Sequence, residues 1–68
     1  MNKKIEQFTE LCAVSRHKGL STEEHRLKIK LTKELQEEGS LVWKDNCNWF
    51  VNESDSKYFT ETIKNWKE

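Results

Sequence analysis

The cysteines and histidines of this sequence are the first candidates for a nucleophile or a zinc ligand: Cys12, His17, His25 and Cys47. A catalytic cysteine needs a histidine base held beside it, and neither cysteine has one at a meaningful local spacing. On a helix Cys12 and His17 are about 140° apart, so they cannot chelate one ion. The sequence also lacks the Cys-x-x-Cys and His-x-x-x-His pairs typical of zinc sites. We therefore expect no catalytic residue, no metal and no cofactor, and we interpret Cys12 as a small core residue.

The charges of the chain balance, with 12 Lys and Arg against 12 Asp and Glu among 68 residues. Such a balance excludes a strongly basic domain that binds nucleic acid through charge alone. No apolar run is long enough to span a membrane, and the first residues lack the apolar core of a signal peptide. We expect a single cytoplasmic domain over residues 1–68 that does not bind a membrane, with a core small enough for a homodimer to be one way of completing it.

Two helices are predicted in the first half of the chain. Residues 3–18 carry an apolar stripe and end at Gly19 after a basic last turn. Ser21 and Glu24 form a capping box that starts a second helix over residues 22–38, which ends at Gly39. The stripe of the first helix consists of Ile5, Phe8, Leu11, Cys12 and Ser15, and it faces Leu27, Leu31 and Leu35 of the second. Ile29 lies on the opposite side of the second helix, either exposed or covered by the segment that follows.

A β-hairpin and a third helix are predicted in the second half. Residues 41–44 and 48–52 are rich in β-branched and aromatic types, and residues 45–47 between them have turn chemistry. One face of this hairpin must pack on the helices, because an isolated hairpin is unstable in water. After a linker over residues 53–56, a helix over 56–67 places five side chains in one arc: Tyr58, Phe59, Thr62, Ile63 and Trp66. The expected fold class is α+β, in the order helix, helix, hairpin, helix.

Six of the seven aromatic residues lie between positions 43 and 66. One interpretation assigns them to the core. Strand alternation, however, places Trp43 and Val42 on opposite faces of the hairpin, and likewise Phe50 and Trp49. Some rings must therefore point away from the buried side, and exposed aromatic rings are typical anchors of protein interfaces. The residues that we expect to contact a partner are Trp43, Trp49, Tyr58 and Trp66.

Two segments resemble known families. Residues 8–31 resemble the two-helix hairpin of the small YnzC-like bacterial proteins, a resemblance that implies no activity. It is carried by Phe8–Leu11, Arg16–Ser21, Glu23–Glu24 and Leu31. Residues 14–55 resemble small winged-helix proteins such as excisionase-like phage regulators. This second resemblance is carried by Ser15, Gly19–Ser21, Leu35–Gly39 with Leu41–Val42, Trp49–Val51 and Ser54–Asp55.

The winged-helix resemblance implies DNA binding through the second helix and the hairpin. The basic side chains in those positions are Arg26, Lys28, Lys30, Lys33 and Lys44. Glu23 and Glu24 at the start of the second helix would repel phosphate, so we favour a protein partner. The expected function is that of a small interaction protein, a phage-encoded inhibitor or adaptor that binds a protein through aromatic side chains. The alternative is an excisionase-like DNA-binding regulator.

Overall fold

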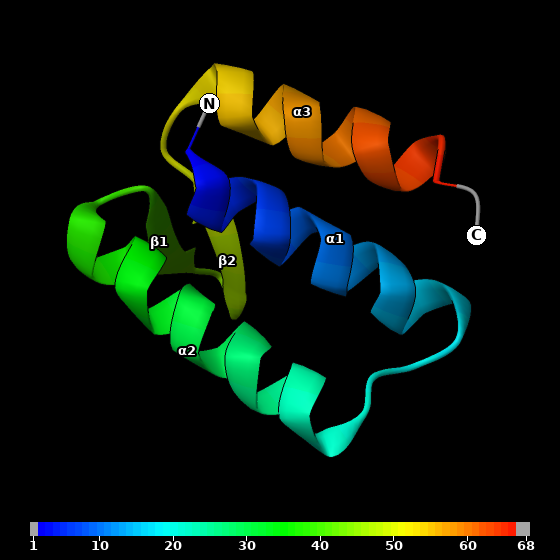
Figure 1. Cartoon of the computed structure of the whole chain (residues 1–68). Coiled ribbons are helices and arrows are strands. Elements are labelled where there is room, and N and C mark those ends of the chain that lie inside the picture. The colour runs from blue at the N-terminus through cyan, green and yellow to red at the C-terminus, as the bar shows by residue number, and fades with distance from the viewer. Residues whose placement is uncertain (1, 67–68) are drawn as a thin grey trace.

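The computed structural model describes residues 2–66 and shows three helices and a two-stranded antiparallel sheet (Figure 1). In chain order the elements are α1 (Lys3–His17), α2 (Thr22–Glu38), β1 (Leu41–Lys44), β2 (Cys47–Phe50) and α3 (Glu53–Lys64). The predicted α+β class and element order are confirmed, and the outline is winged-helix-like. None of the described helices is long and apolar enough to cross a membrane.

Helix α1 lies between the other two helices. It contacts α2 on one side and α3 on the other, so that α1 and α2 form a helical hairpin (Figure 1). The β-hairpin lies behind α1 and α2 in this view, with β1 packed against α2 and β2 against α3. The hairpin is thus supported by the two outer helices of the fold.

Local signals fix both ends of α2, as predicted. The Ser21 hydroxyl accepts a hydrogen bond from the Glu24 N–H at 3.2 Å, and the Glu24 carboxylate accepts from the Ser21 N–H at 3.0 Å. At the other end Gly39 has φ of 84°, a left-handed conformation that disfavours residues with a Cβ. The Ser40 N–H then donates to the Leu35 carbonyl at 2.9 Å, which satisfies an end carbonyl and turns the chain into β1.

The hairpin turn is one residue shorter than predicted. Asp45 and Asn46 both have positive φ, 53° and 64°, as in the two-residue type I′ turn that suits the twist of a hairpin. Cys47 is therefore a strand residue and pairs with Lys44, and its assignment to the turn was wrong. Strand β2 ends at Phe50, two residues before the predicted end.

Helix α3 begins at Glu53, three residues before the predicted start. Asn52 caps the helix, because its side-chain oxygen accepts from the Ser54 N–H at 2.8 Å. The predicted linker is therefore the first turn of the helix. The helix ends at Lys64, so Trp66 follows it, and the predicted last residue, Lys67, lies outside the described residues.

The core is formed where the helices meet the hairpin. Its buried members are Ile5, Phe8, Leu11, Leu31, Leu35 and Leu41. Three phenylalanines join α1, β2 and α3: the ring centroids lie 6.1 Å apart for Phe8 and Phe50, 6.0 Å for Phe8 and Phe59, and 5.2 Å for Phe50 and Phe59. These separations lie in the range of favourable aromatic pairs.

The buried part of α1 is wider than the predicted stripe, because helices cover it on two sides. Thr9 and Ala13 are both fully buried, and the Thr9 hydroxyl is satisfied by the Ile5 carbonyl at 2.7 Å. Ser15, predicted in the stripe, is exposed. On α2, Leu31 and Leu35 are buried as predicted, whereas Leu27 is 41% exposed. Ile29 is 56% exposed, so of the two predicted alternatives the exposed one holds.

Candidate functional site

The two faces of the hairpin have different surroundings. Strand pairing places Leu41 opposite Phe50 and Trp43 opposite Asn48 on the inner face, where Leu41 is buried and Phe50 half-buried. The alternate positions form the outer face, and all four strand residues there are exposed: Val42, Lys44, Cys47 and Trp49. Val51, at the next alternate position after Trp49, is exposed as well. We call Val42, Trp49 and Val51 the outer hairpin face.

Trp49 is the largest side chain of the outer hairpin face, and its position is fixed. Its indole N–H donates to the Lys44 carbonyl at 2.9 Å, yet 53% of the residue remains exposed. Val42 lies directly across the strand pair from it. The indole therefore has its polar atom satisfied within the hairpin, while much of its apolar surface stays in contact with water.

Trp43 lies on the inner face but beyond the part that the helices cover. It is 64% exposed. Its cross-strand neighbour Asn48 accepts a hydrogen bond from the Gln36 side chain of α2 at 2.7 Å, which ties the end of the hairpin to that helix. Trp43 and Trp49 thus point to opposite faces of the same hairpin.

The other two residues predicted to contact a partner lie elsewhere. Tyr58 and Trp66 are half-buried and line a groove between α1 and α3. The four predicted contact residues therefore do not form one continuous surface. Sequence analysis missed the contributions of Val42 and Val51 to the outer hairpin face, although strand alternation from Trp49 would have identified both.

The basic residues predicted to contact DNA lie only partly on one surface. Arg26, Lys30 and Lys33 are exposed, and their spacing of four and three residues places them on one side of α2. Lys28 is half-buried and lies near Cys12 instead. Lys44 is exposed at the end of β1.

Three acidic side chains of α2 already have a partner within the fold. Lys4 pairs with Glu38 at 3.3 Å and with Glu34 at 3.6 Å, and the hydrogen bond to Glu38 raises the pKa of Lys4. The Glu24 carboxylate is held in the capping box, and the hydrogen bonds from Ser21 lower its pKa. Lys4 thus offsets part of the charge of Glu34 and Glu38, whereas Glu24 keeps its negative charge. Glu23 and Glu37 stay exposed on α2 beside its basic side chains.

The cysteines and histidines do not assemble into a site. Cys12 is half-buried against the core, and its burial raises the pKa of the thiol, with Lys28 and Arg16 acting in the opposite direction. Cys47 is exposed on β2, and His17 and His25 are exposed on either side of the loop between α1 and α2. Within residues 2–66, no group of three or more His, Cys, Asp or Glu side chains is placed to hold a metal ion.

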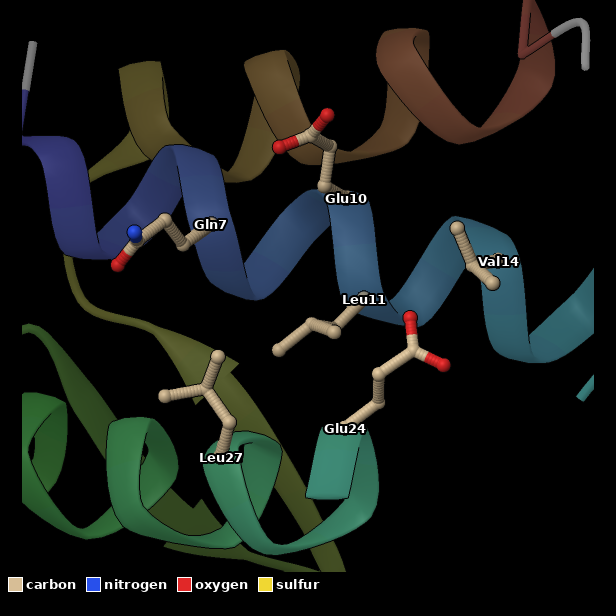
Figure 2. A pocket seen from close by; sticks show the side chains of 6 residues that line it. All are labelled: Gln7, Glu10, Leu11, Val14, Glu24 and Leu27. Carbon is tan, nitrogen blue, oxygen red and sulfur yellow. The ribbon is translucent and has the colours of Figure 1, made fainter. Parts of the chain in front are cut away.

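A shallow groove of about 250 Å³ separates α1 from α2 (Figure 2). Leu11 and Leu27 extend into it from the two helices, and Glu24 reaches from the start of α2 toward Val14 (Figure 2). Since Leu11 belongs to the core and Glu24 to the capping box, this groove is the outer margin of the helix packing. It supplies no arrangement of reactive groups.

Comparison with protein families, with curated proteins and with solved structures finds no match to this chain. The function must therefore be argued from the geometry of the described residues.

Proposed function

We propose that this chain is an interaction protein that binds a protein partner through the outer hairpin face. The observation that carries the proposal is the pair formed by Trp49 and Val42, which lie opposite one another on a sheet face that no described helix covers. An antiparallel sheet that packs one face on the core leaves the other face in water, and that exposed face normally carries polar side chains. An aromatic and two branched aliphatic residues there indicate contact with another molecule.

The hydrogen bond of Trp49 supports the same proposal. Binding costs free energy when a side chain with many conformations has to be immobilised. The bond to the Lys44 carbonyl holds the indole in place before any partner arrives, so little of this cost remains. A pre-positioned tryptophan is typical of the few residues that supply most of the binding energy of an interface. Such a protein acts by occupying a surface of its partner, as an inhibitor or an adaptor does.

Site-specific photo-cross-linking tests the proposal. Trp49 is replaced by p-benzoylphenylalanine and, as a matched control, so is Lys57, an exposed residue of α3. We expect position 49 to give a single dominant protein adduct in host cells. An excess of unlabelled wild-type protein should suppress this adduct, whereas an excess of the W49A variant should not. Adducts of the same pattern from both positions, or equal suppression by W49A, contradict the proposal.

DNA binding is a second candidate because Arg26, Lys30 and Lys33 share the solvent side of α2. Fluorescence anisotropy of a labelled duplex at increasing salt tests it. Each phosphate contact contributes about 0.9 to the slope of log K against log salt, so removing one of these cations lowers the slope by about one unit. The K57Q variant is the matched control. An affinity that does not change with salt excludes this candidate.

A further inference from the structure

A groove of about 480 Å³ runs between α1 and α3, apart from the outer hairpin face. From α1 it is lined by Lys3, Glu6 and Glu10. From the other side it is lined by Tyr58 and Thr62 of α3 and by Trp66, which lies two residues past the end of that helix. Its volume lies in the range of sites that bind small ligands or single large side chains.

The aromatic wall of this groove is part of the packed structure. Tyr58 and Thr62 are spaced four residues apart and so share one side of α3, and Trp66 continues the same wall past the end of the helix. All three are half-buried, and Tyr58 packs against the hydrophobic core. The backbone N–H of Trp66 donates to the Ile63 carbonyl at 3.3 Å. This bond extends the last turn of the helix and fixes the backbone from which the Trp66 side chain starts. Tyr58 and Trp66 therefore supply the aromatic wall of the groove.

The opposite wall carries two carboxylates without a cationic partner. Glu6 and Glu10 are exposed and lie one helical turn apart on α1. Among residues 2–66 the ion pairs join Lys4 to Glu34 and Glu38, and none involves Glu6 or Glu10. Lys3 contributes one positive charge at the groove, so the charged side chains that line it sum to −1.

This combination of groups selects the charge of the occupant. An apolar occupant would remove water from the two carboxylates and give nothing in return, which is costly. An anion would be repelled by them. A cation satisfies both walls, because it forms charge-assisted hydrogen bonds with the carboxylates and is attracted to the faces of Tyr and Trp rings.

We propose that the groove between α1 and α3 binds a positively charged side chain of a protein partner, through the rings of Tyr58 and Trp66 and the carboxylates of Glu6 and Glu10. This site uses different elements from the outer hairpin face and is a second contact that does not depend on the first. A partner that uses both would present a basic residue to the groove and an apolar surface to the hairpin.

The test is a titration of the full-length ¹⁵N-labelled chain, followed by NMR, with N-acetyl-arginine methylamide as the probe. The matched ligand is the citrulline derivative, which has nearly the same shape and no charge. We expect saturable shifts of the Trp66 indole N–H and of the backbone amides of Glu6 and Glu10 with the arginine probe only. Equal shifts with the citrulline derivative, or no saturable shift with either, would overturn the proposal.

Three variants test the role of charge and of the aromatic ring, because they should change the affinity for the arginine probe in different directions. E6Q/E10Q should weaken binding of the arginine probe about fivefold in total, since exposed ion pairs each contribute little. W66L should weaken it about threefold through loss of the cation–π contact. K3Q should instead strengthen it, because it removes the opposing charge, and a loss of folding cannot produce that result.

Two controls separate this site from other effects. E23Q/E37Q removes the same charge from exposed positions on α2, and W49A removes the anchor of the outer hairpin face. Both should bind the arginine probe as the wild type does. If E23Q/E37Q weakens binding as much as E6Q/E10Q, the effect comes from net charge and the proposed site is refuted. Unchanged binding in W49A shows that the groove binds the arginine probe independently of the outer hairpin face.

Discussion

Replacing two leucines of α2 separately should show how much of the stability comes from the contact of this helix with the core. Leu35 is fully buried, whereas Leu27 is 41% exposed at the groove between α1 and α2. L35A removes a buried side chain and leaves a cavity, which costs about 2–5 kcal/mol. L27A removes a side chain that is only partly buried and leaves an open groove rather than a cavity, so its cost is about 1 kcal/mol.

The difference between the costs of L35A and L27A is large relative to the total free energy of unfolding. A domain of 68 residues has a free energy of unfolding of roughly 3–10 kcal/mol, at about 0.05–0.15 kcal/mol per residue. L35A should therefore lose a large part of that stability, and L27A a small part. Both variants replace the same residue type on the same helix, so helix propensity is matched between them.

Urea unfolding followed by circular dichroism at 222 nm measures both values. Tryptophan fluorescence supplies a second probe, and coincident curves support a two-state transition. L35A should lower the midpoint markedly, while L27A lowers it slightly. If L27A costs as much as L35A, the proposed packing of α2 on the core is wrong.

Three further predictions concern the helix ends and the thiols. S21A should cost about 1 kcal/mol by urea unfolding, because it removes the hydroxyl that accepts from the Glu24 N–H, and a cost near zero would contradict the capping box. The pKa of Glu24 should stay below its ordinary value in an NMR titration of S21A, because the backbone N–H of residue 21 still donates to the carboxylate. Because that pKa is lowered by folding, its contribution to stability is present above the unfolded pKa and is lost as pH falls through the folded pKa. G39A should cost about 1 kcal/mol. The cost comes from the left-handed backbone alone, because beyond the chain neighbours no atom lies within 4 Å of the added Cβ, and a cost near zero would contradict that conformation. Cys47 should react with Ellman's reagent much faster than Cys12, whose thiol is half-buried with a raised pKa; C47S should abolish the fast phase, and equal rates would place Cys12 in solvent.

The elements predicted best are those whose ends are set by short-range signals. Both bounds of α2 follow from Ser21, Glu24 and Gly39, because a capping box and a left-handed glycine act within a few residues of the chain. The start of α3 was predicted less well, since Asn52, Ser54 and Ser56 are all suitable caps. Asn52 begins the helix directly after the Val51 N–H closes the hairpin on the Ser40 carbonyl at 3.0 Å.

The burial of individual side chains could be predicted only where one partner covers an element. Thr9 and Ala13 are buried because α3 packs on α1 opposite α2, and a pattern within residues 3–18 does not reveal that second neighbour. The half-burial of Tyr58 and Trp66 depends on the same contact. The sequence predicted that some rings remain exposed. Which of the three tryptophans are most exposed is decided by the register of the hairpin and the position of α3.

The central position of α1 has a consequence for biosynthesis. The three phenylalanines that close the core come from positions 8, 50 and 59, so α1 is synthesised before the strand and the helix that complete its packing. Domains are synthesised from the amino terminus at a rate of about 5–20 residues per second. During those seconds the apolar side of the nascent helical hairpin has no phenylalanine partners and is open to chaperones. The core of this chain therefore cannot be completed before α3 has been synthesised.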